Sequence, residues 1–307
     1  MSLAAPPCAP PDFEPRRPAL ALPAGSCDCH AHVIGPSSVY PLSEQRIYTP
    51  PDCVAADYRK MLAAVGVERA VLVQPSIYGS DNRLLVDTLT GADPAHWRGV
   101  AVLAGDEDDQ QLERLHAAGV RGARVNLVDR AERDAALPLA ALRGLAERIA
   151  PLGWHLELLA HVDEAGSSLR ALGDLPVPVV FGHLGYLSIG AGVEGAGFRA
   201  LLELMRAGRA WVKLTGPYRL TREALPYPVV DEIAAALRET AAGQLVWGTD
   251  WPHVMLRGVM PNDADLVDLL SNWLPDPALR KRVLVDNPLR LYDFPPLRPA
   301  EASGKAS

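Results

Sequence analysis

The segment SCDCHAHVIGP (residues 26–36) places two of the eight histidines of the chain one residue apart, at His30 and His32. Imidazoles bind divalent metal ions or donate hydrogen bonds to an oxyanion. In an extended strand, residues i and i+2 point to the same face of the sheet. We therefore expect both imidazoles, and Asp28 with them, to face one side.

Two later apolar runs end in residues that suit the same chemistry. FGHLG (residues 181–185) supplies His183, and GTDWPH (residues 248–253) supplies Asp250 and His253. An ionised aspartate can accept a proton from water, either directly or from water polarised by a metal ion. If the fold brings these groups together, they predict a site that activates water.

Three arginines, Arg124, Arg130 and Arg219, lie in or just after other apolar runs. Guanidinium groups present planar forks that match carboxylates. Because the chain carries a net charge of −7, arginines gathered at one site would indicate a small anionic substrate.

The loop QPSIYGSDN (residues 74–82) adds Ser76 and Tyr78, which we expect to contact that substrate. The chain has no G-x-S-x-G motif, and Ser76 follows a proline with no base beside it in the sequence. A nucleophilic serine is therefore not predicted.

These residues lie at the ends of apolar runs that alternate with Ala- and Leu-rich runs of helical spacing. Near-continuous apolar strands are typical of parallel sheets covered on both faces. Eight such runs in 307 residues predict an α/β fold, a (β/α)8 TIM barrel, with the chemistry at the carboxyl ends of the strands. The predicted strands are residues 27–34, 69–75, 98–104, 122–128, 155–161, 178–185, 210–216 and 244–250, and the predicted helices include residues 111–119, 139–153, 198–208 and 229–243.

The barrel is expected to be a single domain over residues 26–296, between an extended Pro-rich lead-in (1–25) and a disordered tail (297–307). The lead-in lacks the basic start and apolar core of a signal peptide, and no run reaches the roughly 18 apolar residues of a membrane span. A pI of about 5.6 does not suggest nucleic-acid binding. We expect a cytoplasmic protein without membrane or nucleic-acid partners, and the sequence leaves the oligomeric state open.

The chain has four cysteines, Cys8, Cys27, Cys29 and Cys53. So few cysteines in a chain of this length do not form a disulfide framework. We interpret them as buried structural thiols, with Cys27 and Cys29 pointing away from the paired histidines.

The combination DCHAHV, RIYTP, QPSIYGSDN, RGARVN, FGHLG and GTDWPH resembles the amidohydrolase superfamily (amidohydrolase 2 family) from about residue 26 to about residue 293. Within it, the chain is most similar to the 2-pyrone-4,6-dicarboxylate lactonase group. The resemblance implies a (β/α)8 barrel that hydrolyses a lactone in the catabolism of aromatic compounds. It also implies that Asp250 is the general base and that His30, His32 and His183 polarise the lactone carbonyl. The residues implied to hold the substrate carboxylates are Tyr48, Ser76, Arg124, Arg130, Arg219 and His253.

The resemblance leaves the cofactor open between two cases. The pyrone lactonase works without a metal, whereas relatives that act on muconolactone-type or sugar lactones use one. Arg124 stands where a lysine would bridge two metals, so a binuclear centre is not expected. We expect no cofactor. The alternative is one divalent ion (Zn²⁺ or Mn²⁺) on His30, His32 and Asp250, with His183 or His161 nearby.

Two positions depart from the pyrone lactonase pattern. Leu159 stands where the resemblance implies a substrate-contacting tyrosine, and Val254-Met255 replaces Pro-Asn after GTDWPH. Both changes make the expected pocket more apolar, so the identity of the lactone stays open between a 2-pyrone-4,6-dicarboxylate-like and a muconolactone-like ring. His161, two residues after Leu159, could supply a donor or ligand, or could simply be a polar loop residue.

Opening of a carboxylated lactone is thus the expected activity. A metal-dependent decarboxylase of an aromatic or unsaturated acid, from the same superfamily, is the alternative. A non-catalytic barrel that only binds an anion is the third hypothesis, and under it Asp250 could be replaced without loss of function.

Overall fold

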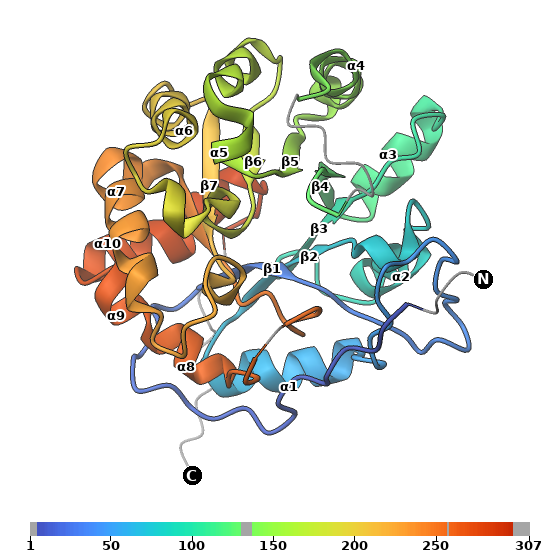
Figure 1. The fold of residues 1–307 in the computed structure, drawn as a ribbon. Coiled ribbons are helices and arrows are strands. Elements are labelled where there is room, and N and C mark those ends of the chain that lie inside the picture. Colours follow the sequence, from blue (N-terminus) through green and yellow to red (C-terminus); the bar gives the residue numbers. More distant parts are fainter. Residues whose placement is uncertain (1–4, 130–136, 257, 297–307) are drawn as a thin grey trace.

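The computed structural model describes residues 5–129, 137–256 and 258–296. Eight parallel strands form one sheet in the order β1 to β8, and helices surround the strands (Figure 1). The strands are β1 Cys27–Ala31, β2 Arg69–Val73, β3 Trp97–Ala101, β4 Val120–Asn126, β5 His155–Leu159, β6 Val179–Phe181, β7 Ala210–Leu214 and β8 Leu245–Trp247. The helices are α1 Ala55–Val65, α2 Arg83–Thr90, α3 Asp109–Ala117, α4 Leu139–Ile149, α5 Val162–Ala165, α6 Ala196–Arg206, α7 Asp231–Ala241, α8 Asp263–Asp268, α9 Leu270–Trp273, α10 Pro277–Lys281 and α11 Asn287–Leu291.

The residues after β8 close the sheet against β1. The backbone N–H of Asp250 donates to the carbonyl of His30 at 2.8 Å, and the N–H of His32 donates to the carbonyl of Trp251 at 2.7 Å. The predicted (β/α)8 barrel is therefore confirmed. The predicted strand segments extend into the loops that follow the observed strands, and these loops carry much of the proposed site.

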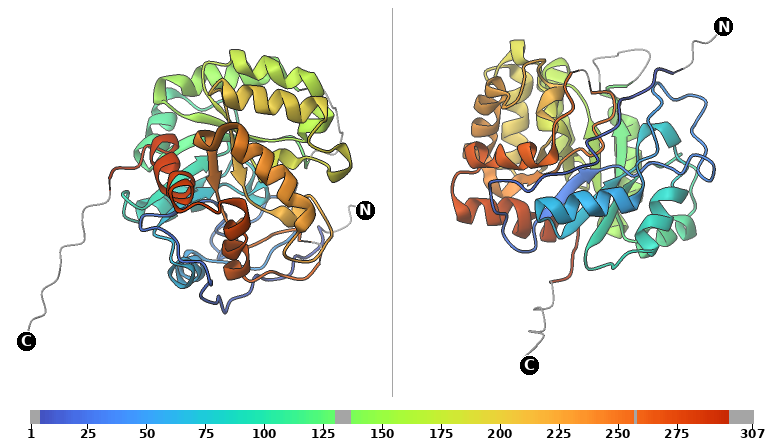
Figure 2. Two further views of the ribbon diagram at one scale, coloured as in Figure 1. Left: turned by 90° about the vertical axis from the view of Figure 1, so that its left-hand side faces the viewer. Right: turned by 90° about the horizontal axis from the view of Figure 1, so that it is seen from below.

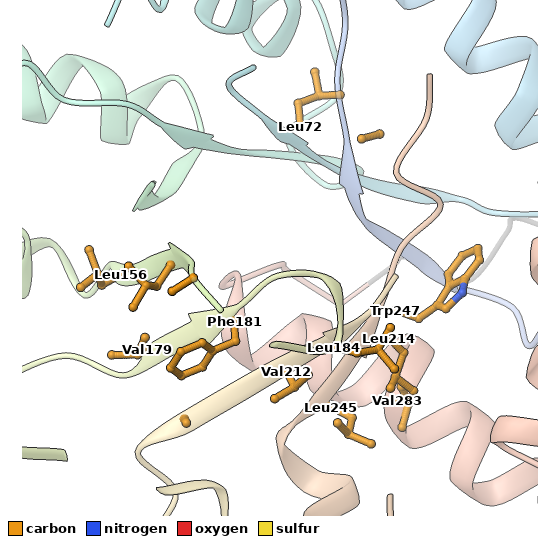
Figure 3. Packing of buried hydrophobic residues seen from close by; sticks show 14 of the residues in the cluster. Leu72, Leu156, Val179, Phe181, Leu184, Val212, Leu214, Leu245, Trp247 and Val283 are labelled. Atoms are coloured by element: carbon orange, nitrogen blue, oxygen red, sulfur yellow. The ribbon is translucent and has the colours of Figure 1, made fainter. Parts of the chain in front are cut away.

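The outer face of the barrel packs against the helices. Figure 3 shows part of this layer, in which Phe181, Val212 and Leu245 lie close together and are all fully buried. The helices contribute apolar residues at helical spacing. In α6, for example, Leu201 and Leu204 lie on the buried side of the helix.

The inner face of the barrel is mixed in character. Strand register places Val180 beside Trp211, and these side chains belong to a second apolar cluster inside the barrel. The same register brings charged residues to this face. Arg124 pairs with Glu157, and Lys213 pairs with Val246 of the apolar cluster.

A β-bulge in β1 changes which side chains face inward. Asp28 pairs with Ala70 and Ala31 pairs with Leu72, so β1 has one extra residue between these pairs. Asp28 consequently lies on the helix-facing side, where its carboxylate accepts hydrogen bonds from Tyr58 of α1 and from Thr249. The prediction that Asp28 faces the same side as the two histidines was wrong, because strict alternation fails at the bulge.

Because of the same bulge, the predicted orientation of two cysteines was also wrong. Cys27 and Cys29 pack inside the barrel with Val71 and Val246 rather than pointing away from the site. They are buried free thiols, as the sequence predicted.

The described part of the lead-in lies along the outside of the barrel beside α1 and α8 (Figures 1 and 2). Arg16 pairs with Asp265 of α8 at 2.7 Å, and the side chain of Lys60 in α1 donates to the carbonyl of Phe13. The predicted disordered tail (297–307) lies outside the described residues. Among the helices that the structure describes, none is long and apolar enough to cross a membrane.

Candidate active site

The imidazoles of His30, His32 and His183 converge on one carboxylate oxygen of Asp250. The Nε2 atoms of His30 and His32 each lie 3.7 Å from Oδ1 of Asp250, and Nε2 of His183 lies 3.9 Å from it. All four side chains are almost completely buried. The structure thus brings together, from three distant segments, the four residues that the sequence predicted to activate water. These residues, His30, His32, His183 and Asp250, are called the reacting group below.

These distances are too long for direct hydrogen bonds. Among the described residues, neither Oδ1 of Asp250 nor Nε2 of His30 has a hydrogen-bond partner. Polar atoms separated in this way and buried together are suited to share a water molecule or a substrate atom between them. This arrangement is what activation of water requires.

The other carboxylate oxygen of Asp250 is fully engaged. Oδ2 accepts hydrogen bonds from Nε of Arg219 at 2.6 Å and from the hydroxyl of Tyr218 at 2.8 Å. Both donors come from the short 3₁₀ helix η6 (Pro217–Arg219) after β7. One oxygen of Asp250 is therefore anchored, and the other is directed at the imidazoles.

Asp250 is held in its ionised form. Burial raises the pKa of this carboxyl and is the largest single effect, but the opposing effects, led by the Arg219 guanidinium, together outweigh it, and the net pKa of Asp250 lies well below its ordinary value. His183 and His32 shift the pKa in the same direction as Arg219. Asp250 is a carboxylate at every pH near neutrality.

The three histidines are held neutral. Burial lowers the pKa of His30 well below its ordinary value, and the charge of Lys213 lowers it further. Burial, assisted by Arg124, lowers the pKa of His32 to about 4 against the opposing pull of Asp250. Burial also lowers the pKa of His183 well below its ordinary value. Neutral imidazoles next to an ionised carboxylate can hold a water molecule without competing for its proton.

Backbone conformation at the site is unusual for non-glycine residues. His183, Asp250 and His253 have φ values of 48°, 67° and 59°. Such left-handed conformations cluster at functional sites, where the surrounding structure holds them in place. At Gly216 (φ 58°), a Cβ atom would lie 2.8 Å from Nδ1 of His183 and 3.2 Å from Oδ2 of Asp250, so this position requires glycine.

A narrow recess of about 30 Å³ borders the reacting group, and it adjoins a wider cavity of about 390 Å³. Asp129, Tyr186, Arg219 and Met255 line both spaces. The wider cavity has the size of an ordinary small-molecule site. Four of the residues that were predicted to hold the substrate line the recess: Tyr48, Ser76, Arg124 and Arg219.

Arg124 is the arginine best placed to hold an anionic group. Its Nη1 donates to the carbonyl of Gln74 at 2.9 Å. Its buried Nε has no partner among the described residues. Arg219 also lines the cavity, but its Nε is committed to Asp250. Arg130 lies outside the described residues.

Two residues predicted to contact substrate are placed elsewhere. The hydroxyl of Tyr78 accepts the backbone N–H of Gly35 at 2.9 Å, and Tyr78 does not line the recess. The ring of His253 is buried behind Tyr218, with Nδ1 2.8 Å from the Tyr218 hydroxyl and Nε2 3.3 Å from Asp263. His253 thus supports the residue that holds Asp250.

The two departures from the lactonase pattern do fall at the cavity. Leu159, Val254 and Met255 all line the recess and give it an apolar wall. His161 lines the wider cavity, where its Nδ1 lies 3.0 Å from the carbonyl of Tyr186. Because a carbonyl only accepts, Nδ1 of His161 is the donor there.

Three side chains have the spacing of a site for one divalent cation. His30, His32 and Asp250 each offer an atom within 4.8 Å of the others. A metal-binding histidine donates its other ring N–H to a carbonyl or carboxylate. His32 meets this condition, because its Nδ1 lies 2.7 Å from the carbonyl of Val73.

His30 does not meet the condition. Its Nδ1 lies 3.2 Å from Nζ of Lys213, a group that only donates. The site therefore has the spacing of a cation site, whereas the contact of His30 with Lys213 departs from the usual surroundings of a metal-binding histidine.

The sequence analysis did not predict several residues that contact His30 and Asp250 or line the cavities. Tyr218 binds Asp250, Tyr186 lines both cavities, and Lys213 and Glu157 lie beneath His30. The charged pair had one signal in the sequence, since Lys213 and Glu157 are charged residues inside strands that are mostly apolar. Tyr186 and Tyr218 had none, because both lie in short 3₁₀ helices after strands, and no local pattern of apolar and polar residues marks such segments.

Comparison with known proteins matches residues 27–294 to the amidohydrolase family. The chain is 35% identical over 275 residues to a 4-sulfomuconolactone hydrolase from Hydrogenophaga intermedia, covering 89% of this chain and 90% of the relative. It is 36% identical over 287 residues to a 2-pyrone-4,6-dicarbaxylate hydrolase from Comamonas testosteroni, covering 91% and 93% of the two chains. A solved structure from Pseudomonas putida, described as a candidate 2-pyrone-4,6-dicarboxylic acid hydrolase, superimposes with a TM-score of 0.77 at 33% identity and covers 89% of this chain and 99% of that one. With these matches spanning the whole barrel, the chain belongs to the amidohydrolase family.

Proposed function

We propose that this protein hydrolyses a small carboxylated lactone, with Asp250 as the general base. The observation that carries the proposal is the free oxygen Oδ1 of Asp250, which faces three neutral imidazoles while Arg219 and Tyr218 hold Oδ2. The relatives named above are hydrolases of cyclic esters. Decarboxylation is accordingly not favoured.

The reaction begins with a water molecule between Oδ1 of Asp250 and the imidazoles. Asp250 accepts one proton of this water while the water oxygen forms a bond to the lactone carbonyl carbon. The carbonyl oxygen becomes an oxyanion in the tetrahedral intermediate. The intermediate then releases the ring oxygen, which takes the proton from Asp250 and leaves a ring-opened acid. Water is consumed, and the carboxylate is regenerated.

The developing oxyanion needs donors in a dry site. Nε2 of His30 and Nε of Arg124 are both buried and have no partner within the described part of the chain. We assign His30 to the carbonyl oxygen. His32 presents Nε2 as an acceptor, because its Nδ1 donates to Val73, and it helps Asp250 to orient the water.

The substrate is expected to carry an anionic group on one side and apolar surface on the other. Arg124, Ser76 and Tyr48 form a polar corner in which the Ser76 hydroxyl lies 3.5 Å from that of Tyr48. Leu159 and Met255 line the recess as an apolar wall. This combination favours a lactone with a carboxylate beside the ring and an uncharged substituent facing Leu159.

Purified protein incubated with a panel of carboxylated lactones tests the proposal. Ring opening changes the ultraviolet absorbance and releases one proton per turnover, so the two signals should agree in stoichiometry. Turnover of at least one lactone, lost in Asp250→Asn, supports the proposal. Absence of turnover for every lactone, together with carbon dioxide release from an unsaturated acid, would favour the decarboxylase instead.

A further inference from the structure

A buried ion pair lies directly beneath His30, on the inner face of the barrel. Nζ of Lys213 in β7 lies 2.6 Å from Oε2 of Glu157 in β5, and both side chains are inaccessible to solvent. Neither group borders the recess or the wider cavity. A buried pair of this kind is costly to desolvate and is weak support for a purely stabilising role.

Lys213 makes three polar contacts, one for each of its ammonium hydrogens. Besides Glu157, it donates to the carbonyl of Cys29 at 2.7 Å, and its third contact is Nδ1 of His30 at 3.2 Å. An ammonium group has three donors and no acceptor. Nδ1 of His30 must therefore be the accepting nitrogen of the ring, and the ring proton must be on Nε2.

Glu157 does not offer His30 the opposite arrangement. Its Oε1 lies 3.5 Å from Nδ1 of His30, and this oxygen forms no hydrogen bond with any described residue. An N–H on Nδ1 would instead point toward the ammonium group of Lys213. Glu157 serves to fix Lys213 in place.

His32 has the opposite arrangement. Its Nδ1 lies 2.7 Å from the carbonyl of Val73, so this nitrogen carries the proton and Nε2 is unprotonated. The two histidines of the H-x-H segment therefore present different groups at the same distance, 3.7 Å, from Oδ1 of Asp250.

We propose that Lys213 is a positioning residue that fixes His30 as the Nε2–H tautomer, so that His30 is a hydrogen-bond donor beside the acceptor His32. The pair can then orient a water molecule or a carbonyl oxygen in one direction only. The catalytic use of this tautomer rests on the proposed function, whereas the tautomer itself is a property of the resting protein. It also explains why His30 is ill suited to bind a metal through Nε2.

Nitrogen-15 NMR of the resting protein, labelled at histidine, tests the proposal without any substrate. The signals are assigned by their loss in His30→Gln and His32→Gln. We expect the proton of His30 on Nε2 and the proton of His32 on Nδ1, as distinguished by the chemical shifts of the two ring nitrogens and by one-bond coupling. A proton on Nδ1 of His30 in the unmodified protein would overturn the proposal.

Variants then test whether Lys213 is the cause. Lys213→Met in the Glu157→Gln background removes the donor without leaving a buried charge, and the Nε2–H signal of His30 should weaken as Nδ1–H appears. Glu157→Gln alone keeps the donor and should keep the tautomer. If the double variant retains the tautomer of the unmodified protein, Lys213 is not its cause and the proposal fails.

Kinetics give an independent readout. With an active lactone, the double variant should lose about tenfold in kcat with little change in KM, the loss of one hydrogen bond in the transition state. Replacing Lys213 with glutamine in the same background restores a donor amide and should recover part of kcat. A protein with the expected tautomers that opens no lactone would refute the proposed function and leave this inference intact.

Discussion

Arg219 binds only one of the two carboxylate oxygens of Asp250. Its Nε lies 2.6 Å from Oδ2, while Oδ1 remains free and faces the imidazoles. A guanidinium that bound both oxygens would have left neither of them free to accept a proton. The single contact lowers the pKa of Asp250 and leaves Oδ1 without a hydrogen-bond partner among the described residues, as the proposed role of a general base requires.

The first prediction concerns Asp250 itself. Asp250→Asn keeps the side-chain volume but removes the proton acceptor, so kcat should fall by about 10²- to 10⁴-fold, the usual contribution of a general base. KM should change much less. Steady-state kinetics measure both constants, and thermal unfolding checks that the variant is folded. A variant as active as the unmodified protein would leave only a binding role for the barrel.

The second prediction separates substrate binding from catalysis. Arg124→Met removes a charged donor from the recess and should raise KM, with a cost of about 1.5–3 kcal/mol in kcat/KM, as for a hydrogen bond to a charged group. Tyr78→Phe is the matched control, because the structure places the Tyr78 hydroxyl against the backbone of Gly35. It should leave KM unchanged. A KM effect at Tyr78 equal to that at Arg124 would contradict this placement.

The third prediction concerns metals. Because Lys213 opposes the tautomer that a metal ligand needs at His30, protein purified without added metal should contain metal well below one equivalent. Activity should survive dialysis against a chelator. Elemental analysis and chelated assays measure this directly. Loss of activity with a chelator, restored by Zn²⁺ or Mn²⁺, would instead make His30, His32 and Asp250 ligands.

The fourth prediction is the pH dependence of kcat/KM. Burial lowers the pKa of His32 to about 4, and the pKa of Asp250 is held well below its ordinary value. Both groups are in their active forms above these values, so kcat/KM should be level from neutrality down to about pH 5 and fall only below it. Initial rates across a buffer series test this. An acid limb centred above about pH 6 would point to a histidine with an ordinary pKa in the reaction.

The fifth prediction concerns the seam between β1 and β8. Asp28 accepts hydrogen bonds from the backbone and hydroxyl of Thr249, yet burial raises its pKa from 3.8 to about 6. The folded protein therefore binds this proton more tightly than the unfolded chain, and the contribution of Asp28 to stability falls as pH rises from about 4 to 6.

Comparison with Asp28→Asn, which cannot titrate, isolates this effect. Between about pH 4 and pH 7, the free energy of unfolding of the unmodified protein should fall relative to that of the variant by on the order of 3 kcal/mol. Urea unfolding of both proteins at each pH provides the measurement. Parallel pH profiles would show that Asp28 is ionised without cost in the folded protein.

Local patterns in the sequence were sufficient to predict the barrel and the membership of the reacting group. Apolar strands and amphipathic helices report which faces must be buried, and that pattern is local. Polar residues near the carboxyl ends of such strands or just after them, including His30, His183 and Asp250, must then meet at the carboxyl end of the barrel. For this reason the predicted group converges on one carboxylate oxygen.

The contacts of each side chain, by contrast, were set by the folded structure. The bulge in β1 reversed the predicted orientation of Asp28, and packing placed His253 behind Tyr218 rather than against the cavity. The contact between Lys213 and His30 joins residues 183 positions apart. Such contacts depend on strand register and on the angle at which loops leave the barrel, and neither quantity is encoded in the local pattern of apolar and polar residues.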